Sequence, residues 1–526
     1  LFALTFDDAP SAPATYVAAD RLSVRTPDDG RLDEPSDLRN PANGADFIII
    51  TPADFRTAAE RLAAHRRGDG FDVLVVASED IFDEFSHGRF DREALPRFIA
   101  HAYHEWFKRP ALLLLFGDET WDYRGKYTGR RNQRLIPTQY YLARRRGYSP
   151  SDYRLSLVDG DDLLADLSVG RLAVDSAPEA EIVVDKVIAY DESPEAGEWH
   201  SRSIYAANWH AINEFSAPLD SMAARYTEPL GLQSVRLYAE DETPLPNALG
   251  RRFVEELNKG ALIANFSGHG AAGTMQYLFS TQRPEWDFLS QVQNGRRLPL
   301  VLALSCLNGL FVDPHTEGLS ELLTEWPHGG AIAYISATAI SFTAQNSLLQ
   351  EGLYSQFFAE NQTRFGPALD VAKARMLAAH SSFVDDAQTM QLTGDPAQRL
   401  ALPPAPDYAA LDLIVADTPV RGRTTQVTAV VGNNTRLGPT GPVVSLVGHS
   451  HDGIIDTLLR QVQAPFAGVD SLVVDWPVAA NGDYNLSLIV GGEDIIDDPD
   501  ESNNRLGMTV RIVEAPVATP FLPAEG

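Results

Sequence analysis

The sequence has little cysteine and no long hydrophobic run. Cys306 is the only cysteine in 526 residues, so neither an internal disulfide nor a cysteine-based metal site can form. The longest apolar runs, such as 111–116, have the length of a strand and not the roughly 18–20 residues of a membrane helix. The chain also lacks an initial Met and a basic segment leading into an apolar run, so we expect a signal peptide to be absent or already removed.

Basic residues are scarce relative to acidic ones. Lys and Arg total 43 against 72 Asp and Glu, which gives a formal net charge of -29. Such a charge repels phosphate backbones and anionic lipid surfaces, so nucleic acid is not an expected partner. Hydrophobic residues at 44% and charged residues at 22% are ordinary for a globular protein, and the length predicts several domains.

Strand-like and helix-like segments alternate over residues 46–195 and again over 196–400. Alternation of this kind predicts a parallel sheet with helices on both faces. We therefore expect an α/β core of two parallel-sheet subdomains with these bounds. The main strands are expected at 47–50, 72–76, 111–116, 167–172, 204–207, 234–238, 261–266, 298–304 and 331–336, and helices at 54–67, 92–106, 178–190, 222–230, 246–258 and 347–360.

The pattern changes after residue 400. Residues 401–410 contain several prolines and predict a stiff linker. Short strand-like runs separated by turn residues follow over 411–513, and they predict an antiparallel β-sandwich. Residues 1–45 predict an irregular lead-in, and residues 514–526 a proline-rich tail.

Two reactive side chains each follow an expected apolar strand. His269 stands in Gly268-His269-Gly270 and Cys306 follows Ser305. Ligands of open parallel sheets bind beyond the carboxyl ends of the strands, and an imidazole there can activate a thiol for attack on a carbonyl. The N–H groups of Gly270 and Cys306 can receive the resulting oxyanion, so the expected reaction is acyl transfer. Taken singly, such a cysteine is more often a buried small hydrophobe, and such a histidine a structural hydrogen-bonding group.

Several segments occur in the order typical of one peptidase family. They are 115–118 (LFGD), 151–153 (SDY), 169–172 (VGRL), 265–270 (NFSGHG), 305–309 (SCLNG), 318–323 (GLSELL), 329–333 (GGAIA) and 394–396 (GDP). Together they resemble the gingipain family of caspase-like cysteine peptidases over about residues 46–400. The resemblance implies a caspase-like fold and hydrolysis of peptide bonds in protein or peptide substrates. It also implies that Cys306 is the nucleophile and His269 the general acid/base, and no cofactor is required for this chemistry.

The chain departs from the family pattern at the strand that opens the second subdomain. Family members carry an acidic residue at the end of that strand, whereas this strand ends Ala207-Asn208. We expect Asn208 to orient the imidazole, as in Cys-His-Asn peptidases, with a low turnover.

The segment that would set the specificity of the substrate pocket contains both acidic and small residues. Glu214 and Asp220 are the candidate pocket carboxylates, but Ser216 and Ala217 stand nearer the matching position. A buried cationic side chain needs a fixed carboxylate, so we expect no strict requirement for Arg or Lys before the scissile bond.

An acidic loop suggests a cation site. Asp152, Asp162 and Asp166 are candidate calcium ligands, because calcium prefers several oxygen ligands and related peptidases bind calcium; a solvated turn is the alternative. Residues 411–513 resemble the CARDB type of immunoglobulin-like domain, through 412–415 (DLIV), 431–435 (VGNNT) and the acidic hairpin 497–504. That resemblance implies a secreted or bacterial cell-surface setting, with attachment through flanking segments.

Two other functions remain open. The chain can be a non-catalytic bacterial surface adhesin with a degenerate peptidase core, which the missing acid near Asn208 favours. It can also be a caspase-like protease confined to the cytoplasm, which a single reduced thiol permits, although the β-sandwich argues against it. Rapid alkylation of Cys306 in the folded protein would favour the peptidase.

Overall fold

The computed structural model describes residues 35–123, 126, 135–192, 194–195, 197–208, 214–239, 248–283, 287–402, 408–433, 441–453, 455–463, 468–479, 482–491 and 501–515. The expected lead-in, linker and tail lie mostly outside these residues, so the domain boundaries stay predictions. The core and the β-sandwich are described separately below.

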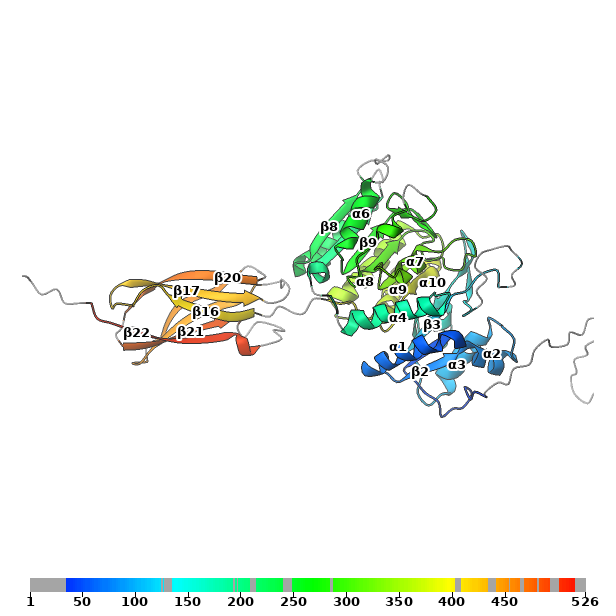
Figure 1. Ribbon diagram of the computed structural model, residues 1–526, viewed down its shortest axis with the longest axis horizontal. Helices are drawn as coiled ribbons and strands as arrows, with labels where there is room; N and C mark the ends of the chain where they lie inside the picture. Colours follow the sequence, from blue (N-terminus) through cyan, green and yellow to red (C-terminus); the bar gives the residue numbers. More distant parts are fainter. Residues whose placement is uncertain are drawn as a thin grey trace, which may run out of the picture. The chain divides into compact units, whose positions relative to one another are not determined.

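Ten strands of the described chain form one sheet in the core, in the order β2-β1-β3-β6-β15-β14-β13-β9-β7-β8 (Figure 1). Apart from β15, which is antiparallel to β14, the paired strands run parallel. Their bounds are β1 Phe47–Thr51, β2 Val73–Ala77, β3 Leu112–Phe116, β6 Ser168–Leu172, β7 Arg202–Ala207, β8 Gln233–Tyr238, β9 Ile263–Ser267, β13 Leu300–Leu304, β14 Ala333–Ala337 and β15 Met390–Thr393. The sheets of the two expected subdomains are thus joined into one, through β15.

Helices cover both faces of this sheet because the strands are apolar on both sides. In β1, Phe47 and Ile49 belong to an apolar cluster that also contains residues of α1, α4, α5, α8 and α9, whereas Ile48 and Ile50 belong to a second cluster with residues of α2 and α3. In β9, Phe266 packs with α6 and α7. The helices are α1 Arg56–Gly68, α2 Ser78–Ser86, α3 Ala94–Glu105, α4 Ala177–Glu192, α5 Ser216–Met222, α6 Ala248–Asn258, α7 Leu319–Glu325, α8 Thr343–Phe358, α9 Phe365–Ala379 and α10 Val384–Thr389. The expected α/β class with helices on both faces is confirmed.

Two small antiparallel sheets lie outside the main sheet. β4 (Tyr140–Ala143) pairs with β5 (Gly147–Pro150), and β10 (Gly270–Ala271), β11 (Thr274–Met275) and β12 (Phe279–Ser280) form a small antiparallel sheet directly after β9. The sequence pattern does not predict these elements, because two to four residues are too few to establish a period. The second group lies beside the candidate active site.

Residues 408–512 form a β-sandwich of two antiparallel sheets, β16-β17-β20 and β19-β18-β21-β22. Its strands are β16 Tyr408–Val415, β17 Thr424–Asn433, β18 Val443–Ser450, β19 Ile455–Val462, β20 Gly468–Pro477, β21 Gly482–Val490 and β22 Arg505–Ile512. The inward residues alternate along the strands and pack around Trp476 and Tyr484. The expected sandwich is present, and β19 is an edge strand whose described side chains are mostly exposed.

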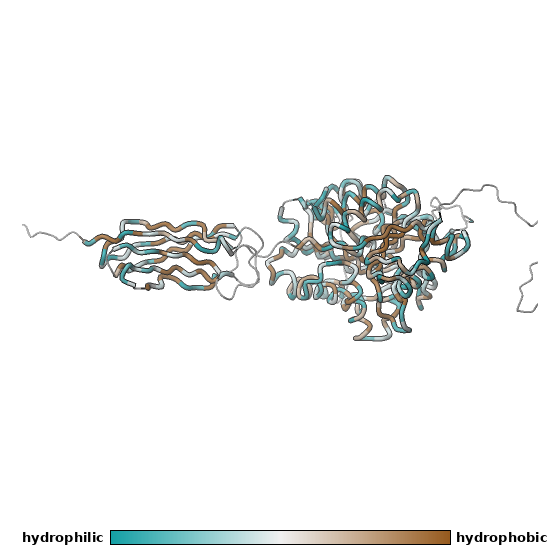
Figure 2. Tube along the Cα trace, turned by 90° about the horizontal axis from the view of Figure 1, so that it is seen from below, coloured by the Kyte–Doolittle hydropathy of each residue, from teal (hydrophilic) through white to brown (hydrophobic). Residues whose placement is uncertain are grey.

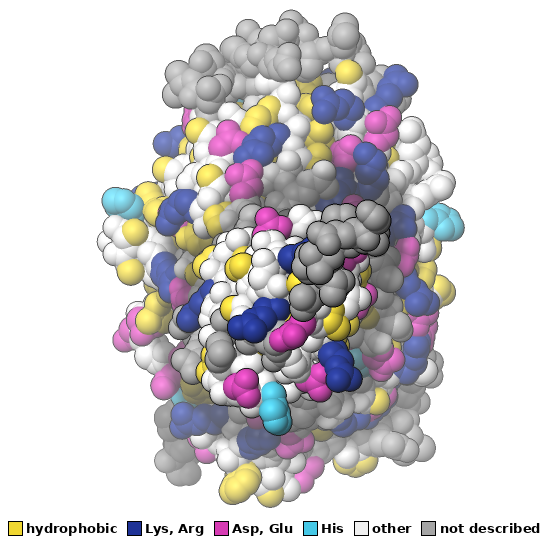
Figure 3. Space-filling view, turned by 90° about the vertical axis from the view of Figure 1, so that its left-hand side faces the viewer, with side chains coloured by type: hydrophobic (Ala, Val, Ile, Leu, Met, Phe, Trp, Pro, Cys, Tyr) yellow, Lys and Arg dark blue, Asp and Glu magenta, His cyan; other side chains and the backbone are white. Residues whose placement is uncertain are grey.

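Hydropathy and charge are distributed as expected for folded domains. The strands of the core include long hydrophobic stretches (brown in Figure 2), with hydrophilic segments toward the outside. On the face seen in Figure 3, Lys and Arg side chains are interspersed with Asp and Glu and do not gather into a patch of one sign. Within the described residues, no helix is long and apolar enough to cross a membrane.

Candidate active site

His269 and Cys306 follow neighbouring strands in matching positions. β9 and β13 are parallel partners, and Ser267, the last residue of β9, pairs with Leu304, the last residue of β13. His269 lies two residues beyond Ser267, and Cys306 lies two residues beyond Leu304. Because the two strands leave the same edge of the sheet in register, the structure brings the two predicted residues to the same place.

The hairpin after His269 presents a backbone N–H group. The Gln276 N–H donates to the His269 carbonyl at 3.0 Å, so these two residues form a hydrogen-bonded pair. Such pairs alternate with non-bonded ones in an antiparallel ladder, which leaves the next pair, Gly270 and Met275, without mutual hydrogen bonds. The Gly270 N–H therefore points away from β11. A Cβ atom at Gly270 would lie 2.8 Å from the Cys306 carbonyl oxygen, so only glycine permits this close approach of the two loops.

The thiol of Cys306 is half-buried and lies against a second loop. Its S–H donates to the Ser341 carbonyl at 3.6 Å. The next residue, Leu307, has a left-handed φ of 62°, which is uncommon for a side chain of this kind, and its N–H donates to Ala339. Among the described residues, no backbone carbonyl accepts the N–H of Cys306 itself. Backbone strain of this kind is often found where a protein fixes a reactive group.

The imidazole of His269 is exposed and has one aromatic neighbour. The Phe215 ring meets it edge to face, with a centroid distance of 5.2 Å and an interplanar angle of 85°. The ring packs against this buried side chain on one side and is open to solvent elsewhere. An accessible imidazole is free to exchange protons, which proton transfer during acyl transfer requires.

Asn208 holds the backbone of the histidine loop. It follows β7, which is the other partner of β9, and its side chain is buried. Its amide oxygen accepts the His269 N–H at 2.6 Å, and its amide nitrogen donates to the Gln276 carbonyl. A Cβ atom at Gly268 would collide with this amide, so the glycine allows the contact. Asn208 is thus placed to orient His269 through the main chain.

Asn308 holds the same hairpin from the other side, and the sequence did not assign it a role. Its buried amide nitrogen donates to the carbonyls of Ala271 at 2.5 Å and Thr274 at 2.8 Å. The Tyr334 hydroxyl donates to its amide oxygen at 3.4 Å, and burial raises the pKa of Tyr334 well above its usual value, so this donor stays neutral. The only sequence signal for this contact was the position of Asn308 two residues after the cysteine.

The two candidate pocket carboxylates are placed differently. Asp220, on α5, accepts hydrogen bonds from the Arg236 guanidinium at 2.8 Å and from the Tyr238 hydroxyl at 2.9 Å, so its charge is already compensated. Glu214 directly precedes Phe215 and accepts the Thr343 hydroxyl at 2.6 Å. Glu214 therefore lies next to the residue that packs on His269, whereas Asp220 is committed to the partners on β8.

The three candidate calcium ligands are not brought together in the described part of the chain. Asp152 is buried and forms a two-point ion pair with Arg171, at 2.7 and 2.9 Å. Asp166 accepts the N–H groups of Val158 and Asp159, at 2.8 and 2.9 Å. Asp162 accepts the N–H of Leu164 at 2.9 Å, so Asp162 and Asp166 each bond to backbone N–H groups of their own loop. Calcium binding stays a prediction.

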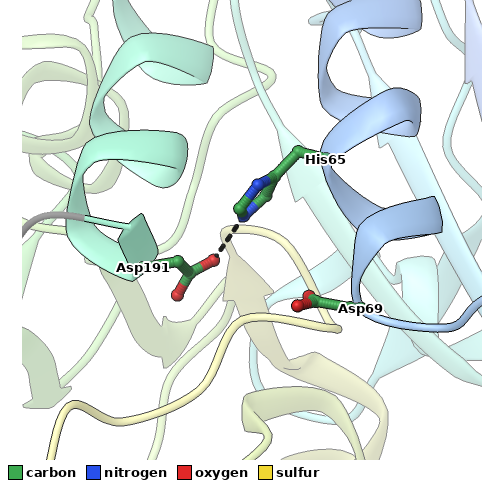
Figure 4. Close-up of side chains that lie close together, drawn as sticks. All are labelled: His65, Asp69 and Asp191. Atoms are coloured by element: carbon green, nitrogen blue, oxygen red, sulfur yellow. Dashed lines mark hydrogen bonds and ion pairs between the residues drawn. The ribbon is translucent and has the colours of Figure 1, made fainter.

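Another group of side chains has the spacing of metal ligands. His65, Asp69 and Asp191 place one ligand atom each within 4.8 Å of one another, and Figure 4 shows the hydrogen bond between His65 and Asp191. The buried Arg66 guanidinium bonds to the carboxylates of Asp69 at 2.8 Å and Asp191 at 2.7 Å. Because this arginine already supplies the positive charge, the group is explained as an ion-pair network.

The mostly parallel sheet with helices on both faces defines a caspase-like α/β protein. The model of peptidase family C25 matches residues 40–401, which is more than half of the chain. The chain belongs to peptidase family C25, the gingipain family.

Solved structures show the same fold. The complex of the Porphyromonas gingivalis RgpB pro- and mature domains is 17% identical, with a TM-score of 0.57, over 89% of this chain and 99% of that one. The Arg-specific cysteine proteinase gingipain R (RgpB) is also 17% identical, with a TM-score of 0.56, over 90% of this chain and 100% of that one. At 17% identity these comparisons establish a shared fold, and they do not assign a role to any residue of this chain.

The β-sandwich also has structural neighbours. A CARDB domain from Pyrococcus furiosus, in complex with di-metal ions, matches 21% of this chain at 18% identity with a TM-score of 0.18. A TM-score of that size does not establish a shared fold, so the relation to CARDB domains remains a sequence resemblance. No curated protein matches the chain.

Proposed function

We propose that this chain is a cysteine endopeptidase that hydrolyses peptide bonds through Cys306 and His269 and an acyl-enzyme. Membership of a peptidase family supports peptide or protein substrates. The observation that best supports the residue assignment is the register of β9 and β13, because His269 and Cys306 each follow the end of their strand by two residues.

The chemistry proceeds in two steps. The Cys306 sulfur attacks the scissile carbonyl carbon while His269 takes the thiol proton, and the carbonyl oxygen becomes an oxyanion between the N–H groups of Gly270 and Cys306. His269 then gives its proton to the leaving amine as the C–N bond breaks, which leaves a thioester. Water, deprotonated by His269, attacks the thioester, and the acid product and free thiol are released.

Asn208 acts as a positioning residue in this proposal. Its amide is engaged by the His269 N–H and the Gln276 carbonyl, so it controls where the histidine backbone lies. Because this amide bonds to the backbone and carries no charge, it does not stabilise an imidazolium as a carboxylate would, which supports the expected low turnover. The same feature favours the alternative, a non-catalytic surface adhesin with a degenerate core.

Alkylation and hydrolysis together separate these two functions. Folded protein is treated with iodoacetamide near pH 7, and the labelled residue is identified by mass spectrometry, with Cys306→Ala as the blank. Rapid labelling, together with hydrolysis of fluorogenic peptides that is abolished by Cys306→Ala and by His269→Ala, supports the peptidase. Labelling only after unfolding would contradict it and favour the adhesin.

A secreted or bacterial cell-surface location completes the proposal. It is supported by the resemblance of residues 411–513 to CARDB domains. Fractionation of the source cells with an antibody against the β-sandwich tests it, and recovery of the protein only from the cytosol would contradict it.

A further inference from the structure

A pocket lies beside the loop that contacts Cys306. It encloses about 220 Å³, far more than the roughly 10–15 Å³ that one water molecule requires. Its lining includes Ile340 and Phe342, the two chain neighbours of Ser341, whose carbonyl accepts the Cys306 S–H. The lining therefore starts one residue from the contact with the thiol, within reach of a peptide held there. We call it the 340–342 pocket.

Three consecutive arginines line this pocket from the turn of the β4–β5 hairpin. Residues 144–146 join the two strands beyond the pair formed by Ala143 and Gly147, and all three arginine side chains are exposed. They stand out in a chain whose formal net charge is -29. A concentration of positive charge beside a pocket attracts negatively charged ligands.

Hydrogen bonds to neighbouring segments fix this turn. The Asp385 carboxylate, on α10, accepts the Tyr141 hydroxyl at 2.7 Å and the Arg144 N–H at 3.0 Å. At the end of β5, the Pro150 carbonyl accepts the Thr338 hydroxyl at 2.6 Å. Because the turn is held in place before a ligand arrives, binding there costs less in ordering the protein.

Arg145 and Arg146 carry positive charge that the described part of the chain does not neutralise. The guanidinium of Arg144 lies 3.8 Å from the Asp385 carboxylate, whereas neither Arg145 nor Arg146 forms an ion pair with a described residue. The other carboxyl group of the lining belongs to Asp386, which is buried. Burial, with a smaller effect of the Asp385 charge, raises the pKa of Asp386 to about 7, so this group is partly protonated near neutral pH.

An exposed aromatic ring positions one of these two arginines. The Arg145 guanidinium lies over the Phe342 ring, 4.7 Å from its centre, and Phe342 is 38% exposed. Contact with the ring limits the positions of the guanidinium and leaves its N–H groups available as donors. These donors form the fork that matches the two oxygens of a carboxylate.

These groups discriminate between side chains by charge. An Asp or Glu side chain gains charge-assisted hydrogen bonds from Arg145 and Arg146. An Asn or Gln side chain has nearly the same shape but carries no charge, so its hydrogen bonds to the same donors are weaker. A Lys or Arg side chain is repelled.

We propose that the 340–342 pocket is a substrate subsite that accepts an Asp or Glu side chain of the bound peptide, with Arg145 and Arg146 as the residues that determine this specificity. The inference rests on the proposed peptidase function, whose substrate class it narrows to peptides with an acidic residue near the scissile bond. The carboxylate binds the two guanidinium groups, and the Phe342 ring contacts the methylene carbons of the same side chain.

Peptide binding tests the subsite without requiring hydrolysis. The full chain carrying Cys306→Ala is titrated with fluorescently labelled peptides in which one position at a time is Glu, Gln, Asp, Asn or Lys, and anisotropy gives the Kd. At low salt we expect Glu or Asp at one position to bind about three- to tenfold more tightly than Gln or Asn, and Lys to bind most weakly. The preference should shrink in about 0.5 M salt, which screens exposed charges.

Substitutions in the turn assign the preference to the arginines. Arg145→Gln and Arg146→Gln should each reduce it, and the double variant should abolish it, with circular dichroism as the check of folding. Replacing both arginines by Glu should shift the preference to Lys. Arg109→Gln is the matched control, because Arg109 is also exposed and lies 5.2 Å from the centre of the Tyr103 ring but does not line the pocket.

Several results would overturn the subsite. They are absence of peptide binding, equal Kd values for the Glu and Gln peptides, and a preference for Glu that survives the double variant. Tighter binding of every peptide by Arg145→Gln would also overturn it, because that result would show that Arg145 blocks the pocket.

Hydrolysis by the chain with Cys306 intact is scored separately. Binding that is selective for Asp or Glu, without hydrolysis, would uphold the pocket and contradict the proposed function. Hydrolysis without this selectivity would contradict the pocket alone.

Discussion

Replacing Asn208 distinguishes two ways in which it can serve the histidine. The asparagine makes two hydrogen bonds to the hairpin that carries His269, one to the His269 N–H at 2.6 Å and one to the Gln276 carbonyl. Each neutral hydrogen bond contributes about 0.5–1.5 kcal/mol, so Asn208→Ala removes roughly 1–3 kcal/mol of ordering from this hairpin. If all of it is lost from the transition state, kcat/KM falls about 5- to 150-fold.

The loss of activity in Asn208→Ala is judged against the loss in Cys306→Ala. Loss of the nucleophile in a well-studied serine peptidase costs on the order of 10⁶ in kcat, so Cys306→Ala is expected to be far more damaging than Asn208→Ala. The assay is kcat/KM with one fluorogenic peptide, accompanied by the rate of iodoacetamide labelling and by circular dichroism. A loss equal to that of Cys306→Ala would make Asn208 a full member of a catalytic triad, and no loss would remove it from the site.

Asn208→Asp separates the backbone role from direct contact with the imidazole. A carboxylate still accepts the His269 N–H, but it cannot donate to the Gln276 carbonyl and places a negative charge against that oxygen. We therefore expect Asn208→Asp to be no more active than Asn208→Ala. Activity raised to or above that of the unaltered protein would show that the residue acts on the imidazole, as the acid of related peptidases does, and would refute the backbone role.

Three further outcomes are expected. Glu214→Gln should lower any preference for Arg or Lys before the scissile bond, whereas Asp220→Asn should leave it unchanged, and cleavage confined to Arg or Lys peptides would contradict the expected broad specificity. Asn308→Ala should lower kcat more than it raises KM, because it loosens the Gly270 hairpin, and an effect on KM alone would be evidence against this. Since the pKa of Asp386 is raised to about 7 from an ordinary value near 3.8, the folded state binds the extra proton between these values. Stability should therefore fall as pH rises from about 4 to 7, and this slope, measured by urea unfolding, should be reduced in Asp386→Asn.

The sequence predicted the core elements that appear as a continuous apolar run or as a helical repeat of apolar residues. The strands at 47–50, 111–116 and 298–304 and the helix at 178–190 are each found within about two residues of their expected ends. β15 was missed because it has four residues, and its pairing with both β14 and β6 depends on contacts between distant parts of the chain. The two expected sheets are joined because β15 pairs with both β14 and β6, and such long-range pairing cannot be read from the local sequence.

The candidate site was predictable where it depends on strand ends and not where it depends on side-chain partners. The positions of Cys306 and His269 follow from apolar strands that end in reactive residues. The engagement of Asp152 by Arg171 could not be foreseen, because the two residues lie on separate segments that meet only in the folded sheet. An acidic loop therefore suggested calcium ligands, although the fold commits the most buried of these carboxylates to an arginine.

The hydrogen bonds that fix the His269 hairpin explain how the candidate site can function with an amide, and not a carboxylate, at position 208. The hairpin that carries His269 and Gly270 is fixed from the β7 side by Asn208 and from the β13 side by Asn308, which together bond to four of its backbone groups. Both are neutral amides, so they fix the geometry of the imidazole and of the Gly270 N–H without adding a net charge beside them. Preorganised backbone donors act only if they do not have to reorganise during the reaction. The two asparagines provide that rigidity, and the order β13-β9-β7 accounts for their positions, because each lies beyond the end of a strand that flanks β9.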